Sequence, residues 1–534
     1  MLFFTKNYFS YILYFGTIIY ALFCTTRFFG TNDDMLVMLF LSGLYTGEPS
    51  EYIVFQNIII GKVLKQLYIY DPSINWYTLF FDIVQTLSFG ALFILMNKIL
   101  DKKIFIFLFV FPMLYFIVEM YTYLQFTKVA FLSSITGILY IILFLYNNKK
   151  RYMVLAFILL TLGFMIRFKA LYGSVLLFLP VAGHIFFKHR KYILNLKFLI
   201  FSFVIISTFF SLHIYNHNYY NNTPEWKNFK ALIDIRRIVY YDRSITKECF
   251  LKYSKLYNIS KNDVKTFYKW ANDDAKVFTP ALLHHIHSSC TTGFELQYEK
   301  ATNINSLKQF FYKLSTFDFS FIFIFIIYLL FILSKQAKLF FILYFFYFTS
   351  ILFFIFTLIF DYRVVSSLVL EFYLLLLLFT HLEKVKKYYF STKMLTYVTF
   401  SLFFLSIYTI LYPKVMHKKI PISLKNELPI LKDNYIIVLK SNNFFNYLPL
   451  DTNFKNLFEN KIFYYVGWTL SSPDNLKVLK NAKNFYELLL NKPNVILYMD
   501  EHRLPVIKQY IYEHFGKNIE FIQLMPYFYK VKIH

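Results

Sequence analysis

Residues 130–151 read AFLSSITGILYIILFLYNNKKR, an uncharged run that ends in Lys149, Lys150 and Arg151. The run is close to the ~20 residues that a helix needs to cross ~30 Å of hydrocarbon. Lys and Arg gathered at one end of such a run are typical of its cytoplasmic side. This stretch therefore predicts a transmembrane helix whose carboxyl end faces the cytoplasm.

The same pattern recurs along the chain, which is 57% apolar, 22% aromatic and only 16% charged, beyond the apolar share of soluble domains. Candidate spans lie at residues 9–25, 77–96, 104–120, 130–146, 153–166, 171–187, 196–213, 319–333, 339–360, 364–379 and 395–411. The net charge of +25 gathers in the short links between runs, so it indicates membrane orientation and not nucleic-acid binding. We predict an all-α polytopic membrane protein with about eleven transmembrane helices.

The basic links also predict the orientation of the chain. With the amino terminus inside, the links 98–103, 149–151, 188–197, 335–338 and 384–393 all face the cytoplasm and are strongly basic. Within a membrane domain of residues 1–412, this leaves a first loop (27–76) and a second loop (215–318) on the outer face. The tail (413–534) alternates short apolar strands at 435–439, 495–498 and 521–524 with amphipathic stretches at 475–490 and 504–515. It predicts a small extracytoplasmic α/β domain.

An acidic pair stands at the start of the first loop, where residues 27–34 read RFFGTNDD. A carboxylate held near the membrane surface can act as a general base on a sugar or lipid hydroxyl, because partial desolvation raises its pKa. Asp33 and Asp34 could equally hold a divalent cation. The plainer alternative is that they only cap an interfacial helix, since Asp is favoured at that position.

The predicted organisation of the chain resembles that of the GT-C glycosyltransferases. It has one amino-terminal helix, a large outer loop with an acidic pair, many short-linked helices and an outer carboxyl-terminal domain. The closer likeness is to uncharacterised bacterial GT-C-like membrane proteins, and it covers roughly residues 1–400. It rests on NDD at 32–34, YTGEP at 45–49, QFT at 125–127, Arg167 and WANDD at 270–274.

The resemblance implies an inverting enzyme that uses a polyprenyl-phosphate-linked sugar donor and a glycan or glycolipid acceptor, in the bacterial cytoplasmic (inner) membrane. Asp33 or Asp34 would be the catalytic base or hold a divalent cation, with a slight preference for Asp34, and no cofactor is certain. Cationic side chains would bind the donor phosphate, and the candidates are Arg167, Arg363, Arg27 and Lys169. The alternative for each cation is an arginine or lysine at a helix end that only reaches toward water.

Three other functions stay open: a lipid-linked oligosaccharide polymerase, a flippase or transporter, and a non-catalytic subunit of polysaccharide assembly. The second loop also holds Cys249 and Cys290, which either pair in an oxidising compartment or remain free thiols. His284, His285 and His287 lie close in sequence, but adjacent histidines face different sides of a helix. We expect no metal site from them.

Overall fold

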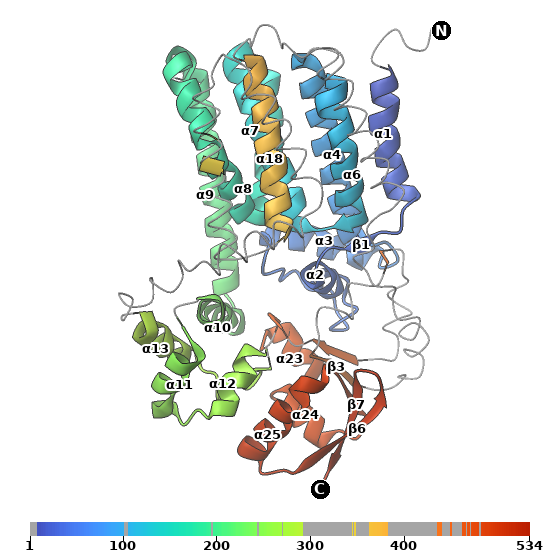
Figure 1. Cartoon of the computed structure of the whole chain (residues 1–534), viewed down its shortest axis with the longest axis vertical. Coiled ribbons are helices and arrows are strands. Elements are labelled where there is room, and N and C mark those ends of the chain that lie inside the picture. Colours follow the sequence, from blue (N-terminus) through green and yellow to red (C-terminus); the bar gives the residue numbers. More distant parts are fainter. Residues whose placement is uncertain are drawn as a thin grey trace, which may run out of the picture.

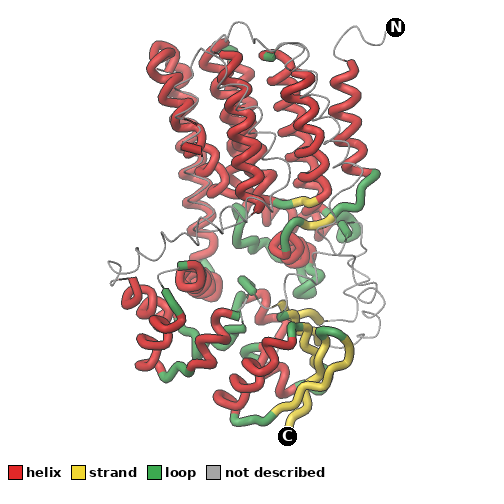
Figure 2. Tube along the Cα trace, viewed as in Figure 1, coloured by secondary structure: helices red, strands yellow, loops and turns green. Residues whose placement is uncertain are grey.

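The computed structural model is mostly helical, with a bundle of long helices at one end and a mixed helical and β region at the other (Figures 1 and 2). It describes residues 8–100, 105–193, 196–242, 245–269, 271–291, 344, 347–348, 362–382, 435–439, 449–450, 462–465, 467–469, 471–479 and 482–534.

Four described helices are long and apolar enough to cross a membrane, which supports a membrane protein. They are α4 (Trp76–Ile99), α7 (Phe126–Asn147), α8 (Lys150–Ile193) and α9 (Leu196–Asn221). The bundle also contains α1 (Tyr8–Phe23), a π-helical turn (Phe105–Val110) that leads into α6 (Phe111–Thr122), and α18 (Tyr362–Leu382). The predicted spans 319–333 and 395–411, and nearly all of 339–360, lie outside the described residues.

Helix α7 forms the centre of the bundle and is the most deeply buried of the four. Small residues allow its neighbour α8 to approach closely. A Cβ added at Gly137 would lie 2.7 Å from the Leu160 side chain, and one at Gly163 would lie 2.3 Å from Ser134 Oγ. Glycine, alanine and serine at such contacts are how membrane helices pack without a hydrophobic driving force.

All of Lys150–Ile193 is assigned to one helix, α8. The contacts of its two halves nevertheless show that the chain turns back within this segment. Gly163 faces Ser134 on α7, and Gly173, ten positions later, faces Phe131 on the same helix. A straight helix would carry Gly173 about 15 Å past Gly163. Two arms of α8 therefore pack on α7, and they correspond to the predicted segments 153–166 and 171–187.

The first loop holds two short helices at the end of the bundle where α1 ends and α4 and α7 begin (Figure 1). They are α2 (Asn32–Ser42) and α3 (Ile58–Tyr70). Helix α2 ends at Gly43, whose φ of +75° is left-handed, and a Cβ there would lie 2.7 Å from the backbone at Pro49. Only glycine fits this turn without strain. The strands β1 (Phe28–Phe29) and β2 (Tyr123–Leu124) pair in parallel beside α2.

The second loop begins as α9 continues into a helical layer below the bundle (Figure 1). This layer contains α10 (Pro224–Tyr241), α11 (Lys247–Ser254), α12 (Lys261–Tyr268) and α13 (Pro280–Thr291). A disulfide between Cys249 and Cys290 joins α11 to α13 across 41 residues of sequence. The sequence left these two cysteines either paired or free, and the structure pairs them.

The tail forms the small α/β unit that the sequence predicted. Its five-stranded sheet has the order β4-β3-β5-β7-β6, with β3 parallel to β4 and β5 and the last two strands antiparallel. The strands are β3 (Tyr435–Val438), β4 (Ile462–Tyr465), β5 (Val495–Tyr498), β6 (Ile519–Met525) and β7 (Phe528–Ile533). The predicted amphipathic stretches become α23 (Pro473–Leu479), α24 (Phe485–Asn491) and α25 (Leu504–Phe515).

Candidate functional site

Asp34 is fully buried in the first turn of α2 and links three parts of the chain. Its Oδ1 accepts hydrogen bonds from the Tyr77 hydroxyl at 3.1 Å and from the backbone N–H of Phe126 at 2.9 Å. Its Oδ2 accepts one from the Thr31 hydroxyl at 2.7 Å. A carboxylate with three donors is well suited to burial. Asp34 therefore fixes α2 against the starts of α4 and α7.

Asp33, one residue earlier, is only half-buried and shares the first turn of α2. A carboxylate at this position gains from the partial positive charge at the amino end of the helix. The two members of the acidic pair thus have different surroundings. Asp34 is inside the protein, whereas Asp33 is partly exposed.

Arg167 contacts the ring of Phe126, whose backbone N–H binds Asp34. Its guanidinium carbon is 5.4 Å from the centre of the Phe126 ring and 5.2 Å from that of Phe55, and its Nη1 donates to the Phe55 carbonyl at 3.4 Å. Trp468 of the tail packs edge-on against Phe55 at 4.7 Å between ring centres. Aromatic faces attract and orient a guanidinium. The structure thus links Arg167 and Asp34 through one residue, Phe126.

The other three predicted phosphate-binding cations are placed differently. Arg27 forms a bidentate ion pair with Asp82 of α4, in which Nη1 lies 3.0 Å from Oδ2. Its positive charge is therefore balanced by a carboxylate of the protein. Lys169 is exposed and lies within electrostatic reach of Arg167 and of Arg237 on α10. Arg363 falls in the first turn of α18, and its side chain lies outside the described part of the structure.

Two buried polar contacts attach the tail to the first loop. The Tyr45 hydroxyl donates to Asn475 Oδ1, and the Ser50 hydroxyl donates to the Asp474 carboxylate. Both tail residues belong to α23. Because both contacts follow α2 directly along the chain, the tail helps to hold the loop that carries the acidic pair.

The second loop meets the tail at Asp273, which lies with Arg236 of α10 in the interior of the protein. Asp273 Oδ2 accepts hydrogen bonds from the Tyr464 hydroxyl at 2.6 Å and from the Phe485 backbone N–H at 2.9 Å. Burial raises the pKa of Asp273 to about 6, and burial lowers the pKa of Arg236 to about 10. The WANDD segment at 270–274 therefore acts as a buried connection between two layers.

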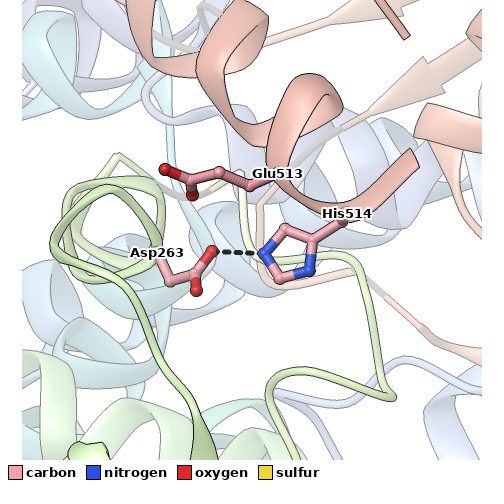
Figure 3. Close-up of side chains that lie close together, drawn as sticks. All are labelled: Asp263, Glu513 and His514. Atoms are coloured by element: carbon pink, nitrogen blue, oxygen red, sulfur yellow. Dashed lines mark hydrogen bonds and ion pairs between the residues drawn. The ribbon is translucent and has the colours of Figure 1, made fainter. Parts of the chain in front are cut away.

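A second contact between these layers is the cluster of Asp263, Glu513 and His514 (Figure 3). It is the only trio of carboxylate, histidine or cysteine side chains close enough to hold a metal ion among the described residues. Its oxygens already accept hydrogen bonds, however. Asp263 accepts from His514 at 2.7 Å and from the Ser260 N–H, and Glu513 accepts from the Ser260 hydroxyl at 2.8 Å. We interpret the cluster as an ion pair that docks α25 on α12.

Asp33 and Asp34 belong to no such trio in the described part of the chain. A divalent cation prefers six or more oxygen ligands, and Asp34 is already committed to three donors. A cation bound here would depend on Asp33, backbone oxygens and water. The divalent cation therefore stays a prediction.

The sequence drew attention to Glu119 and Lys128 beside apolar runs, but sequence reasoning missed Glu371 inside the bundle. Glu371 of α18 is fully buried and accepts a hydrogen bond from the Ser174 hydroxyl at 2.5 Å. Lys128 pairs with Glu119 beside it, around a small cavity that Glu371 also lines. The signal in the sequence was a single Glu within the apolar run 364–379.

No protein-family profile, no curated protein and no solved structure matches this chain. The likeness to GT-C glycosyltransferases therefore remains a prediction from the sequence.

Proposed function

We propose that the chain is a membrane glycosyltransferase that moves a sugar from a polyprenyl-phosphate carrier to a glycan or glycolipid on the outer face of the membrane. The observation that carries the proposal is the arrangement around Phe126. Its backbone N–H binds Asp34, and its ring lies under the Arg167 guanidinium. The acidic pair and the cation proposed to bind the donor phosphate thus lie at the same end of a bundle of apolar helices.

The chemistry assigns separate roles to these groups. An acceptor hydroxyl attacks the anomeric carbon of the donor sugar, and Asp33 takes the hydroxyl proton. The bond between that carbon and the phosphate oxygen breaks, and the electron pair leaves with the lipid phosphate. Arg167 stabilises the departing phosphate by binding two of its oxygens. Attack opposite to the leaving group inverts the anomeric configuration, and Asp34 keeps α2 in position.

The disulfide supports an outer-face orientation for the loops and the tail. Disulfides persist in oxidising compartments and are rare in the cytoplasm. Cys249 and Cys290 lie in the second loop, whose Asp273 contacts the tail, and the tail contacts the first loop through Tyr45. All three parts therefore belong on the same side of the membrane. The basic links at the opposite end of the bundle agree with this orientation.

The test is transfer of labelled sugar by the purified protein in lipid vesicles from a panel of polyprenyl-phosphate sugars. Asp33→Asn should lower transfer by roughly 10²–10⁴-fold, the usual contribution of a positioned base. The matched control is Asp71→Asn, which alters a partly exposed carboxylate in the same loop. Among the described residues, the Asp71 side chain hydrogen-bonds only to the neighbouring Ser73. Equal transfer by wild type and Asp33→Asn would contradict the proposed role. Chelation of divalent cations in the same assay tests the predicted metal.

The alternatives give different outcomes in the same vesicles. A polymerase would lengthen a lipid-linked glycan, with loss of carrier phosphate from one of two identical substrates. A flippase or transporter would move the labelled lipid across the bilayer without breaking the sugar–phosphate bond. A non-catalytic assembly subunit would do neither.

A further inference from the structure

An apolar groove lies between the first arm of α8 and the start of α9, at the opposite end of the bundle from Asp33. Its volume is about 440 Å³. Each helix contributes four residues at the spacing i, i+3, i+4 and i+7, which places them on one helical face. The lining residues are Lys150, Met153, Val154 and Phe157 from α8, and Lys197, Ile200, Phe201 and Val204 from α9.

The groove is apolar along its length and cationic at one end. Lys150 is the first residue of α8 and Lys197 the second of α9, and both are exposed. The first backbone N–H groups of a helix lack partners within the helix and give its start a partial positive charge. Two helix starts and two lysines therefore meet at the same mouth. Anions bind readily at such helix starts.

We infer that this groove binds an anionic phospholipid, with the headgroup phosphate between Lys150 and Lys197 and an acyl chain along Phe157 and Val204. The seven positions from Lys150 to Phe157 span about 10 Å, enough for the upper part of an acyl chain. A free phosphate would leave the apolar wall uncovered, and a neutral lipid would bring no net negative charge to the two lysines. The charge of the mouth and the apolar lining together favour a lipid with an anionic head.

The groove is separate from the proposed sugar-transfer site. Phe164 of α8 stacks on Phe209 of α9 at 4.5 Å between ring centres, and this contact closes the gap between the helices beyond the groove. The inference therefore does not rest on glycosyl transfer. Either proposal can fail without the other.

The test is photo-crosslinking of the full-length protein in vesicles of phosphatidylcholine containing a trace of acyl-diazirine phosphatidylglycerol or, in a parallel sample, acyl-diazirine phosphatidylcholine. Crosslinked peptides are mapped by mass spectrometry. We expect the anionic probe to label residues 150–157 and 197–204 on the order of tenfold more than the zwitterionic probe, as expected for two lysines beside an anionic headgroup.

The double variant Lys150→Gln/Lys197→Gln should abolish this preference. The matched control Lys149→Gln removes an exposed lysine one position before the groove and should leave the preference unchanged. Val154→Trp should block labelling by both probes, and equal melting temperatures of the variants show that the fold is retained. Equal labelling by both probes, or unchanged preference in the double variant, overturns the inference. Absence of labelling here while other lipid-facing residues react would show that protein fills the groove, and it would overturn the inference too.

Discussion

The tripeptide Asn-Asp-Asp occurs twice in this chain, at residues 32–34 and 272–274, and the structure uses the two copies differently. In the first copy, Asp34 is buried as an anchor and Asp33 is half-exposed beside the membrane helices. In the second copy, both carboxylates are buried, and Asp273 joins α10 to the tail. Because the two tripeptides are identical in sequence, the difference comes from the helices and strands that pack over them. That packing decides which carboxylate is exposed.

This difference teaches that an acidic pair becomes a candidate site only where something leaves one carboxylate uncovered. The first copy lies at the start of a helix at the membrane boundary, and only one of its acids faces inward. The second is covered by β4 and α24, whose Tyr464 and Phe485 both donate to Asp273. If this is right, both carboxylates of the second copy only stabilise the fold. In the first copy, Asp34 stabilises the fold and Asp33 is left for chemistry.

The largest effect on stability is expected at the second copy. Asp273→Ala would leave the buried Tyr464 hydroxyl and Phe485 N–H without their acceptor, and each such loss typically costs about 1–3 kcal/mol. Thermal unfolding and limited proteolysis of the tail would measure the loss. Asp234→Ala, which alters an exposed acid on α10, is the matched control and should change little. The double variant Arg236→Met/Asp273→Leu should recover part of the lost stability. If Asp273→Ala is as stable as wild type, the second copy does not stabilise the contact between α10 and the tail.

The disulfide should stabilise the layer that contains the second copy by a similar or slightly smaller amount. It closes a loop across 41 residues, for which chain entropy predicts a contribution of about 3–4 kcal/mol. Cys249→Ser/Cys290→Ser should therefore lower the melting temperature of this layer, whereas Cys24→Ser, at the free cysteine, should not. A reduced protein that melts like the oxidised one would contradict the assignment.

The sequence predicted part of the helical bundle, because membrane spans depend on the local property of apolar length, and four described helices meet that criterion where about eleven spans were expected along the whole chain. The runs at 77–96, 130–146 and 196–213 became α4, α7 and α9. The tail strand at 495–498 was also placed correctly from its apolar run. The two apolar runs at 153–166 and 171–187, predicted as separate spans, correspond to the two arms of α8.

Much of the site could not be predicted, because it depends on contacts between distant segments. Asp33 and Asp34 are equivalent in sequence, and only the approach of Phe126 and Tyr77 makes Asp34 the anchor. Arg27 was considered a phosphate-binding candidate, yet Asp82, 55 positions away, is its partner. Two charges at the outer ends of neighbouring apolar runs were the available signal for that pair.

A smaller effect on stability is expected when the anchor of the first copy is changed. Asp34→Asn keeps one carbonyl oxygen and replaces the charged acceptor of the Thr31 hydroxyl, so the loss should be about 1–3 kcal/mol. Thermal unfolding of the protein in lipid measures it. Thr31→Val removes the same hydrogen bond from the other side, and the double variant should lose no more than the larger single one. Full additivity would contradict the contact.

The smallest expected effect is a weakening of tail docking between pH 5 and pH 8. The hydrogen bond to Asp263 raises the pKa of His514, so its contribution is complete below about pH 6.5 and is lost as pH rises through the raised value. Burial raises the pKa of Asp273 to about 6, so its contribution is likewise lost as pH rises through about 6.

Proteolysis of the tail across this pH range should therefore be faster at pH 8. His514→Gln should flatten the upper part of the dependence, and Asp273→Asn the lower part. Docking that strengthens with rising pH would contradict both assignments.

The most direct test of the divided acidic pair measures sugar transfer and thermal stability together for Asp33→Asn and Asp34→Asn in the same vesicles. We predict that Asp33→Asn loses transfer and keeps the wild-type melting temperature, whereas Asp34→Asn melts earlier. Transfer that survives in Asp33→Asn, or a melting temperature that falls in Asp33→Asn and not in Asp34→Asn, would contradict the account.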